Sequence, residues 1–261
     1  MKPCVLVFAG SDPSGGAGIS ADIEAIAAQG AHALPIITAI TVQNNDRVFS
    51  VHPVDSQLIL QQAQILVNKI AICAIKIGIV ANRANAVALA EWIKAYKTEH
   101  PALPVILDPV LASGHGDVLS IGDAIEALTP LISVATLITP NLPEAEKLCP
   151  DAQSSEERAK QLVQSGVQDV LIKGGHASDT LVTNQWFHND QTRSWQWPRM
   201  VGAFHGSGCT LASAIAGQLA VGANMQQALE AAQHYCHLTL QNSYAIADGQ
   251  RIPQRNATKK L

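Results

Sequence analysis

Aromatic side chains are scarce in this chain of 261 residues, where 4 Phe, 4 Trp and 3 Tyr amount to 4%. Charged residues are also few, at 15%, whereas hydrophobic residues reach 48%. A chain with this balance can bury a large core, which argues against intrinsic disorder. With so few aromatic rings, the core must be built chiefly from Ala, Val, Ile and Leu.

Further absences narrow the function classes. The net charge is −4 and no basic block occurs, so the sequence predicts no nucleic-acid partner. No apolar run is long enough for a membrane span, and the run at 4–8 is too short for a signal peptide. The five cysteines form no CxxC pair, which favours a reducing, cytoplasmic location. The P-loop pattern GxxxxGK[ST] is missing, so any use of ATP requires a different phosphate cradle.

Apolar runs typical of buried strands alternate with segments of helical periodicity. Strands are predicted at 4–9, 34–42, 48–54, 71–77, 104–107, 135–138, 170–172, 181–187 and 192–197, the last two as a hairpin. Helices are predicted at 17–29, 56–70, 82–97, 121–132, 156–164, 207–220 and 225–244. This alternation predicts an α/β domain over 1–247, with a mostly parallel sheet, helices on both faces and a frayed polar tail at 248–261. The glycine-rich loops that follow the strands should gather at the carboxyl ends of the sheet.

The most informative motif is HGSGCT at residues 205–210, at the start of a predicted buried helix. Backbone N–H groups of Gly206, Ser207 and Gly208 should converge there and form an anion site. We expect the helix dipole to lower the pKa of the Cys209 thiol. His205 lies four residues before this cysteine, which raises a cysteine-nucleophile hypothesis, but it precedes the helix and no orienting Asn or Asp is identifiable.

A second glycine-rich loop spans residues 10–18 and allows a small ligand to approach the backbone closely. Within it, Gly16, Gly18 and Ala21 match the GxGxxA dinucleotide fingerprint, which raises a dinucleotide-dependent oxidoreductase as an alternative. The acidic residue that this fingerprint expects at the end of the next strand is missing. Asp22, on the following helix, borders the buried face, where it needs a partner, or it lies exposed at the edge of that face.

Polar residues follow several other predicted strands. Gln43 carries an acceptor and donors on one flat group, which suits an aminopyrimidine edge or a solvated loop. Asn141 and Glu144 have the spacing of a helix capping box, and the same pair could hold a Mg²⁺–phosphate shell through water. Lys173 and Gly174, in the motif KGGH, could neutralise a phosphate or end a strand in a turn.

Eight sequence blocks occur in order between about residues 4 and 220. They are AGSDPSGGAGI with AD at 9–22, TAI at 38–40, QN at 43–44, KIG at 76–78, DPV at 108–110, TPNLPEAE at 139–146, KGGH at 173–176 and HGSGCTL at 205–211. Together they resemble the bacterial hydroxymethylpyrimidine/phosphomethylpyrimidine kinases of thiamine biosynthesis.

The resemblance implies a ribokinase-like three-layer sandwich, usually a homodimer. It implies ATP- and Mg²⁺-dependent phosphorylation of 4-amino-5-hydroxymethyl-2-methylpyrimidine and then of its monophosphate. It also implies that Gln43 reads the aminopyrimidine edge, that Cys209 replaces the Asp base of sugar-kinase relatives, and that the pocket is lined by Gly10, Ala17, Asp22 and Ile79. Relatives generally carry a Lys near Gly114, so its absence bears on the second phosphorylation.

Two further alternatives stay open from the residues. One is a pyridoxal or pyridoxine kinase of the same superfamily, whose substrate is also a flat heteroaromatic hydroxymethyl compound. The other is a sensor that binds the pyrimidine without consuming ATP.

Overall fold

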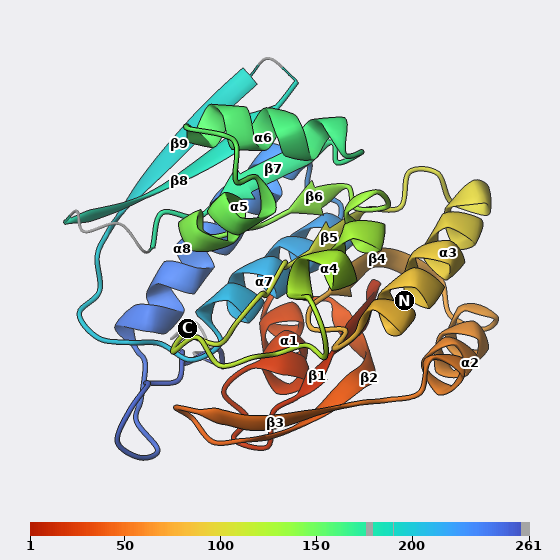
Figure 1. Ribbon diagram of the computed structural model, residues 1–261, viewed down its shortest axis with the longest axis horizontal. Coiled ribbons are helices and arrows are strands. Elements are labelled where there is room, and N and C mark those ends of the chain that lie inside the picture. Colours follow the sequence, from red (N-terminus) through yellow and green to blue (C-terminus); the bar gives the residue numbers. More distant parts are fainter. Residues whose placement is uncertain (176–179, 190, 257–261) are drawn as a thin grey trace.

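One sheet of nine strands runs through the part of the chain that the computed structural model describes, residues 1–175, 180–189 and 191–256. Its strands are β1 (Cys4–Ser11), β2 (His32–Gln43), β3 (Val48–Pro53), β4 (Ile72–Ile77), β5 (Val105–Leu107), β6 (Leu137–Ile138), β7 (Asp169–Ile172), β8 (Leu181–His188) and β9 (Gln191–Pro198). Their order across the sheet is β3-β2-β1-β4-β5-β6-β7-β8-β9 (Figure 1). The run from β2 to β7 is parallel, and β3, β8 and β9 pair antiparallel at the two edges. The predicted mostly parallel sheet is confirmed.

Helices cover both faces of this sheet (Figure 1). One face carries α1 (Gly18–Ala28), α7 (Ser207–Ala220) and α8 (Met225–Gln241). The other carries α2 (Ser56–Val67), α3 (Arg83–Glu99), α4 (Ala124–Ile132), α5 (Leu142–Leu148) and α6 (Ser155–Gln164). Successive buried residues of β1 pack alternately into the two cores, Val5 and Val7 on one face and Leu6 and Phe8 on the other. The predicted three-layer α/β arrangement is therefore confirmed.

Most helices of the described chain start at a side chain that accepts a backbone N–H of the first turn. Six of them do so, at the caps Asp55, Asn82, Asp123, Asn141, Ser154 and Asn224. The two exceptions are α1 and α7, which begin after Ala17 and Gly206 with no side-chain cap. Their first-turn N–H groups are therefore left for another acceptor.

The C-terminal segment differs from its prediction. Residues 248–256 are not a frayed tail, because Ile252 is only 2% exposed and Arg255 only 1%. The backbone of Arg251 and Ile252 pairs with Phe204 and Tyr244. The polar composition of the segment does not indicate this packing, because the packing depends on residues far away in the chain. Residues 257–261 lie outside the described part, and the domain boundary at 247 stays a prediction.

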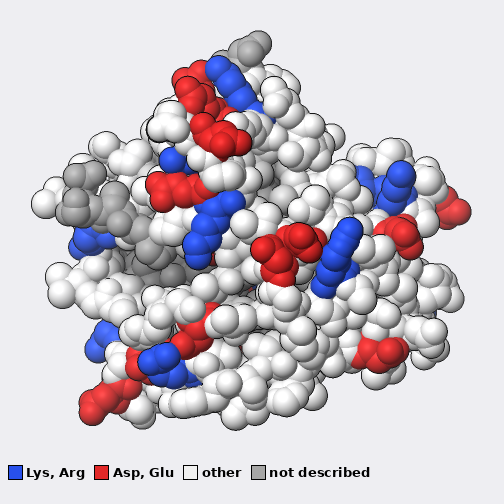
Figure 2. Space-filling model, viewed as in Figure 1, with Lys and Arg blue, Asp and Glu red and all other residues white. Residues whose placement is uncertain are grey.

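The surface and the helix lengths add two observations. Acidic and basic side chains lie interspersed in small groups on the face shown in Figure 2. None of the helices in the described ranges is long and apolar enough to cross a membrane.

Candidate active site

A cavity of about 490 Å³ lies where the parallel strands end. Its lining includes residues that directly follow five parallel strands, namely Gln43 at the end of β2, Ile79 after β4, Asp108 after β5, Asn141 after β6 and Lys173 after β7. The loop after β1 and the first turn of α7 complete this part of the wall. The prediction that the strand-end loops gather at one edge is therefore confirmed.

Most residues predicted for the site line this cavity. They are Gly10, Ala17, Gln43, Ile79, Asn141, Glu144, Lys173, Gly206, Ser207, Gly208 and Cys209. Asp22 and Gly174 do not. A Cβ on Gly174 would lie 2.1 Å from the carbonyl oxygen of Thr183, so this glycine lets the end of β7 approach β8 closely. His176 of the same motif lies outside the described residues.

The turn before α7 is pressed against the loop that follows β1. Gly206 adopts a left-handed conformation with φ of 78°. A Cβ there would lie 2.1 Å from the carbonyl oxygen of Gly16 and 2.9 Å from Cα of Ala17, so only glycine fits. The uncapped starts of α1 and α7 therefore lie side by side on the wall of the same cavity. The N–H groups at the start of α7 lie at the positive end of a helix dipole and favour an anion at this place, whereas the first N–H of α1, that of Gly18, is directed at the Cys209 sulfur.

Lys173 and Asp108 face this turn from the opposite side. Lys173 Nζ lies 3.1 Å from Asp108 Oδ1, which also accepts a 3.3 Å hydrogen bond from Thr139. A Cβ on Gly208 would lie 3.4 Å from Nζ and 3.5 Å from Asp108 Oδ2, so the lack of a side chain there leaves room between the helix and the charged pair. Asp108 Oδ2 is buried and has no hydrogen-bond partner among the described residues. A cation and a carboxylate oxygen thus both face the place where the anion would bind.

Asn141 and Glu144 form the predicted capping box. The backbone N–H of Glu144 donates to Asn141 Oδ1 at 2.8 Å, and Glu144 Oε2 accepts from the backbone N–H of Asn141 at 2.7 Å. Burial raises the pKa of Glu144 to about 7, and the Asp108 carboxylate adds to this rise although Lys173 opposes it. The structural interpretation of this pair is confirmed, and both residues also line the cavity.

The expectation for the Cys209 thiol is wrong in its direction. Burial raises the pKa of Cys209 to about 11, which outweighs the lowering by the Lys76 ammonium, and the carboxylates of Asp22 and Asp108 add to the rise. The sequence places this thiol at a helix N-terminus, but it does not reveal that other residues largely enclose it and that two of them are carboxylates. Removal from water destabilises a thiolate more than one helix terminus stabilises it.

Asp22 does not line the cavity, as the resemblance implied, but is buried behind its wall. It is fully buried, and Lys76, also fully buried, donates to its Oδ1 at 2.8 Å. Ser213 of α7 donates to the same carboxylate at 2.6 Å. Burial lowers the pKa of Lys76, but Asp22, Cys209 and Asp108 together outweigh it and the net shift is upward. The expectation that Asp22 needs a partner is confirmed. Both members of this ion pair lie close enough to Cys209 to influence its pKa.

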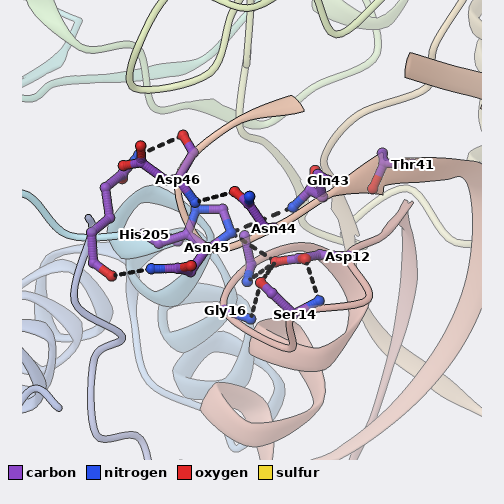
Figure 3. Close-up of polar contacts among 12 residues, drawn as sticks. Asp12, Ser14, Gly16, Thr41, Gln43, Asn44, Asn45, Asp46 and His205 are labelled. Carbon is purple, nitrogen blue, oxygen red and sulfur yellow. Dashed lines mark hydrogen bonds and ion pairs between the residues drawn. The ribbon is translucent and has the colours of Figure 1, made fainter. Parts of the chain in front are cut away.

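Gln43 lies beside an imidazole that was not assigned to the substrate site. His205 Nε2 is 2.8 Å from Asp12 Oδ2 and 3.4 Å from Gln43 Nε2 (Figure 3). His205 therefore bonds to a carboxylate from the loop after β1, and within the described residues no hydrogen bond to Cys209 forms a nucleophile pair. The sequence shows Asp12 only as part of the glycine-rich block, and its place at the end of a strand is the signal that points to a role in the site.

A second lobe of the cavity has apolar and aromatic walls. It is lined by Val182 on β8, Trp197 on β9, Met200 after β9, and His237 and Leu240 on α8. Trp197 and His237 have ring centroids 5.2 Å apart. A flat heterocycle could lie against these walls, with its charged end toward Lys173 and α7.

Three segments meet at the cavity mouth around residues 44–47. Asp46 pairs with His115 at 2.9 Å, and Asn45 donates to the carbonyl oxygen of Gln250 at 3.2 Å. The Gln250 amide also lies 3.3 Å from the position of a Cβ on Gly114. A neutral amide thus borders the place near which relatives were expected to carry a Lys.

The comparisons with known proteins agree with this geometry. The family model for phosphomethylpyrimidine kinase matches residues 12–254. A hydroxymethylpyrimidine/phosphomethylpyrimidine kinase from Rhizobium meliloti is 33% identical over 257 residues, covering 96% of this chain and 95% of that relative. A multifunctional thiamine-biosynthesis protein from Corynebacterium efficiens is 32% identical over 255 residues, but this chain spans only 34% of its length.

Solved structures give the same result. A phosphomethylpyrimidine kinase from Clostridium difficile has a TM-score of 0.77 and 32% identity, covering 90% of this chain and 98% of that one. A pyridoxal kinase from Staphylococcus aureus, in complex with AMP-PCP and pyridoxal, has a TM-score of 0.87 and 25% identity, covering 100% of this chain and 96% of that one.

The fold is therefore ribokinase-like, and the protein is a kinase that acts on a small molecule. More narrowly, the chain belongs to the phosphomethylpyrimidine kinase family. The dinucleotide-dependent oxidoreductase alternative is wrong. The glycines that suggested it have packing roles here, since a Cβ on Gly18 would lie 2.2 Å from the carbonyl oxygen of Gly10.

Proposed function

We propose that this protein transfers the γ-phosphoryl group of ATP to the hydroxymethyl group of 4-amino-5-hydroxymethyl-2-methylpyrimidine, and then a second one to the resulting monophosphate. The observation that carries the proposal is the meeting of two uncapped helix starts with Lys173 and Asp108 in a cavity that also holds Gln43. Phosphoryl transfer depends mainly on positioning and charge stabilisation, which these groups supply. Membership in the kinase family and the relatives' complexes with ATP analogues support ATP as the donor.

The transferring group lies at the start of α7 in this proposal. N–H groups of Gly206, Ser207 and Gly208 donate to its oxygens, and the Lys173 ammonium neutralises part of its charge. The adenine of ATP lies in the second lobe, against Trp197 and His237. The pyrimidine lies at the opposite end, against Ile79, with its heteroatom edge toward Gln43.

The donor set fits a magnesium ion. Asp108 Oδ2 is buried without a partner, and Glu144 lies on the same wall. No three His, Cys, Asp or Glu residues converge on one point anywhere in the described ranges, so waters and phosphates would complete the shell. Asp108 and Glu144 would hold the ion, and Asn141, whose Oδ1 is engaged in the helix cap, would reach it through water. When bound, Mg²⁺ supplies charge neutralisation for the phosphates.

Cys209 is proposed to take the proton of the hydroxyl group. The hydroxyl oxygen bonds to the γ-phosphorus while the bond from that phosphorus to the β,γ-bridging oxygen breaks, and ADP leaves with the electron pair. The hydroxyl proton moves to Sγ of the Cys209 thiolate, which becomes the neutral thiol. Because the pKa of this thiol is about 11, roughly one molecule in 10⁴ carries the thiolate at pH 7. The first phosphorylation should therefore depend on Cys209, whereas the second, with an anionic phosphate as nucleophile, should not.

The deciding experiment follows ATP consumption with the aminopyrimidine alcohol and resolves the mono- and diphosphate products. Both products should appear in order. Cys209→Ala should lower the rate of the first step by about 10²-fold, the lower end of the usual contribution of a general base, because little of the thiol is ionised at pH 7, and it should change the second step little. Equal losses in both steps would leave Cys209 only a packing role. If ATP is not consumed, the catalytic proposal fails and a pyrimidine-binding sensor remains.

Pyridoxal phosphorylation is the second candidate, favoured by the TM-score of 0.87 to a pyridoxal kinase. Comparison of kcat/KM for pyridoxal with that for the aminopyrimidine decides between the two substrates. The second phosphorylation requires room for an anion near Gly114, where Gln250 presents a neutral amide instead of a cation. We further propose a homodimer in the cytoplasm, which sedimentation and cell fractionation can test.

A further inference from the structure

Three residues from three distant segments meet beside the proposed pyrimidine site. Asp12 follows β1, Gln43 ends β2 and His205 precedes α7. Figure 3 shows dashed lines that join His205 to each of the other two residues. The distances from Nε2 are 2.8 Å to Asp12 Oδ2 and 3.4 Å to Gln43 Nε2.

Asp12 is held rigidly as a charged acceptor. Its Oδ1 accepts the backbone N–H of Ser14 at 2.8 Å, and its Oδ2 accepts that of Ala17 at 2.8 Å. Burial raises the pKa of Asp12, but the hydrogen bonds from His205 and Ser14 outweigh it and lower the pKa to about 2. The carboxylate is therefore ionised at neutral pH and can only accept hydrogen bonds.

An ionised carboxylate at 2.8 Å determines what His205 Nε2 carries. A lone pair on Nε2 would face the negative Asp12 Oδ2 at 2.8 Å, so this nitrogen must bear a hydrogen, whether the ring is neutral or charged. The ring has little freedom to turn away, because a Cβ on Gly16 would lie 2.3 Å from its Cδ2 atom and the side chain is only 15% exposed. The Nε2–H group of His205 is therefore fixed in place: it donates to Asp12 Oδ2, and an acceptor atom of Gln43 at 3.4 Å can share it.

This fixed donor restricts the Gln43 amide. An N–H of His205 cannot accept from the amide nitrogen, so the favourable contact has the carbonyl oxygen Oε1 toward His205. In that orientation Oε1 keeps a second lone pair for the ligand, and the amide NH₂ group is free to donate to it. The edge of the Gln43 amide that faces the ligand then presents one acceptor beside one donor in a single, defined order.

We propose that His205, oriented by Asp12, is a positioning residue that holds the Gln43 amide in the order that selects a 4-aminopyrimidine and rejects a 4-oxopyrimidine. The 4-amino group donates to Oε1, and the adjacent ring nitrogen accepts from the amide NH₂. A 4-oxopyrimidine presents the reverse order, a carbonyl oxygen beside a ring N–H, and it could pair only if the amide turned over and lost its contact with His205. This inference rests on the proposed function of Gln43 as the residue that reads the pyrimidine edge.

The test compares kcat/KM for the 4-amino compound and for its 4-oxo analogue, 5-hydroxymethyl-2-methylpyrimidin-4-one. The wild type should prefer the 4-amino compound by about 10²-fold or more, since a mismatched buried edge leaves polar groups unpaired. In His205→Leu the amide can turn freely, so the preference should fall by about tenfold or more. Asp12→Asn, whose side chain can donate to a ring nitrogen, should lower it in the same direction. His52→Leu, on an exposed position of β3, is the matched control and should keep the wild-type ratio.

The ratio separates this role from a merely structural one. If His205 only supports the fold, both substrates lose rate together and the ratio stays within twofold of the wild type, which would overturn the inference. If His205→Leu does not fold, Asp12→Asn gives an independent measurement of the substrate preference. If the wild type phosphorylates neither compound, the proposed function fails together with this inference. If it phosphorylates both equally well, the inference alone fails.

Discussion

Arg255 should be the residue outside the cavity on which the site depends most. Its side chain is fully buried. Nε donates to Thr210 Oγ1 at 2.8 Å, Nη2 donates to the carbonyl oxygen of Gly16, and Nη1 lies 3.3 Å from Glu24 Oε2. The guanidinium thus ties the first turn of α7 to the loop after β1, the two segments that form the proposed anion site.

Arg255→Met keeps most of the side-chain volume and removes these donors. Removing one partner of a buried, hydrogen-bonded ion pair typically lowers the free energy of unfolding by about 3–5 kcal/mol. Because Glu24 is 35% exposed, its part is screened, and we expect the lower end, about 3 kcal/mol. For a chain of this size that corresponds to a fall in Tm of roughly 6–12 °C. The anion site should also lose its alignment, which lowers kcat by about 10²-fold.

Urea unfolding followed by tryptophan fluorescence measures the stability, and steady-state kinetics measure kcat. Arg251→Met is the matched control, since that side chain bonds only to Ser243 among the contacts shown and should cost less than about 1 kcal/mol. If Arg255→Met unfolds within about 0.5 kcal/mol of the wild type and keeps its kcat, the assigned role of Arg255 is wrong.

Four further predictions follow from buried or strained groups. Asp12→Asn should lower the free energy of unfolding by about 2 kcal/mol at pH 7. The difference from the wild type should vanish as the pH falls from 4 to 2, because an acid of lowered pKa stabilises the fold only while it is ionised. Urea unfolding at several pH values measures this. Lys76→Met should cost about 3–5 kcal/mol by stranding its buried carboxylate partner, and a double variant that also neutralises that partner should regain part of the loss. Gly18→Ala should be strongly destabilising because its Cβ would meet a backbone oxygen at 2.2 Å, whereas Gly15→Ala, with φ of 74° and nothing within 4 Å, should cost only about 1–2 kcal/mol. The rate of the first phosphorylation should rise about tenfold per pH unit from 7 to 9 as the Cys209 thiol ionises, and a flat profile would rule out the thiolate as base.

Much of the local structure could be predicted from the sequence. The apolar run at 4–9 becomes β1, Asp55 caps α2, and Asn141 and Glu144 form the capping box that their spacing indicates. These features depend on neighbours within a few residues, so backbone preference and side-chain reach decide them before any distant contact forms. The position of the site was predictable for a similar reason, because loops after parallel strands must gather at one edge of the sheet.

The chemistry of the site depended on contacts between distant residues. Asp12 and His205 are 193 residues apart, and Gly16 and Arg255 are 239 apart. No periodicity or motif indicates that a polar C-terminal segment sends an arginine into the interior, or that two carboxylates and burial raise the pKa of Cys209 to about 11. The sequence by itself determined the strands, the caps and the glycine turns, since each follows from local stereochemistry. Only the tertiary structure decided the charge state of Cys209, the partner of Asp22 and the role of Arg255, because desolvation and ion pairing depend on which distant groups share a dry space.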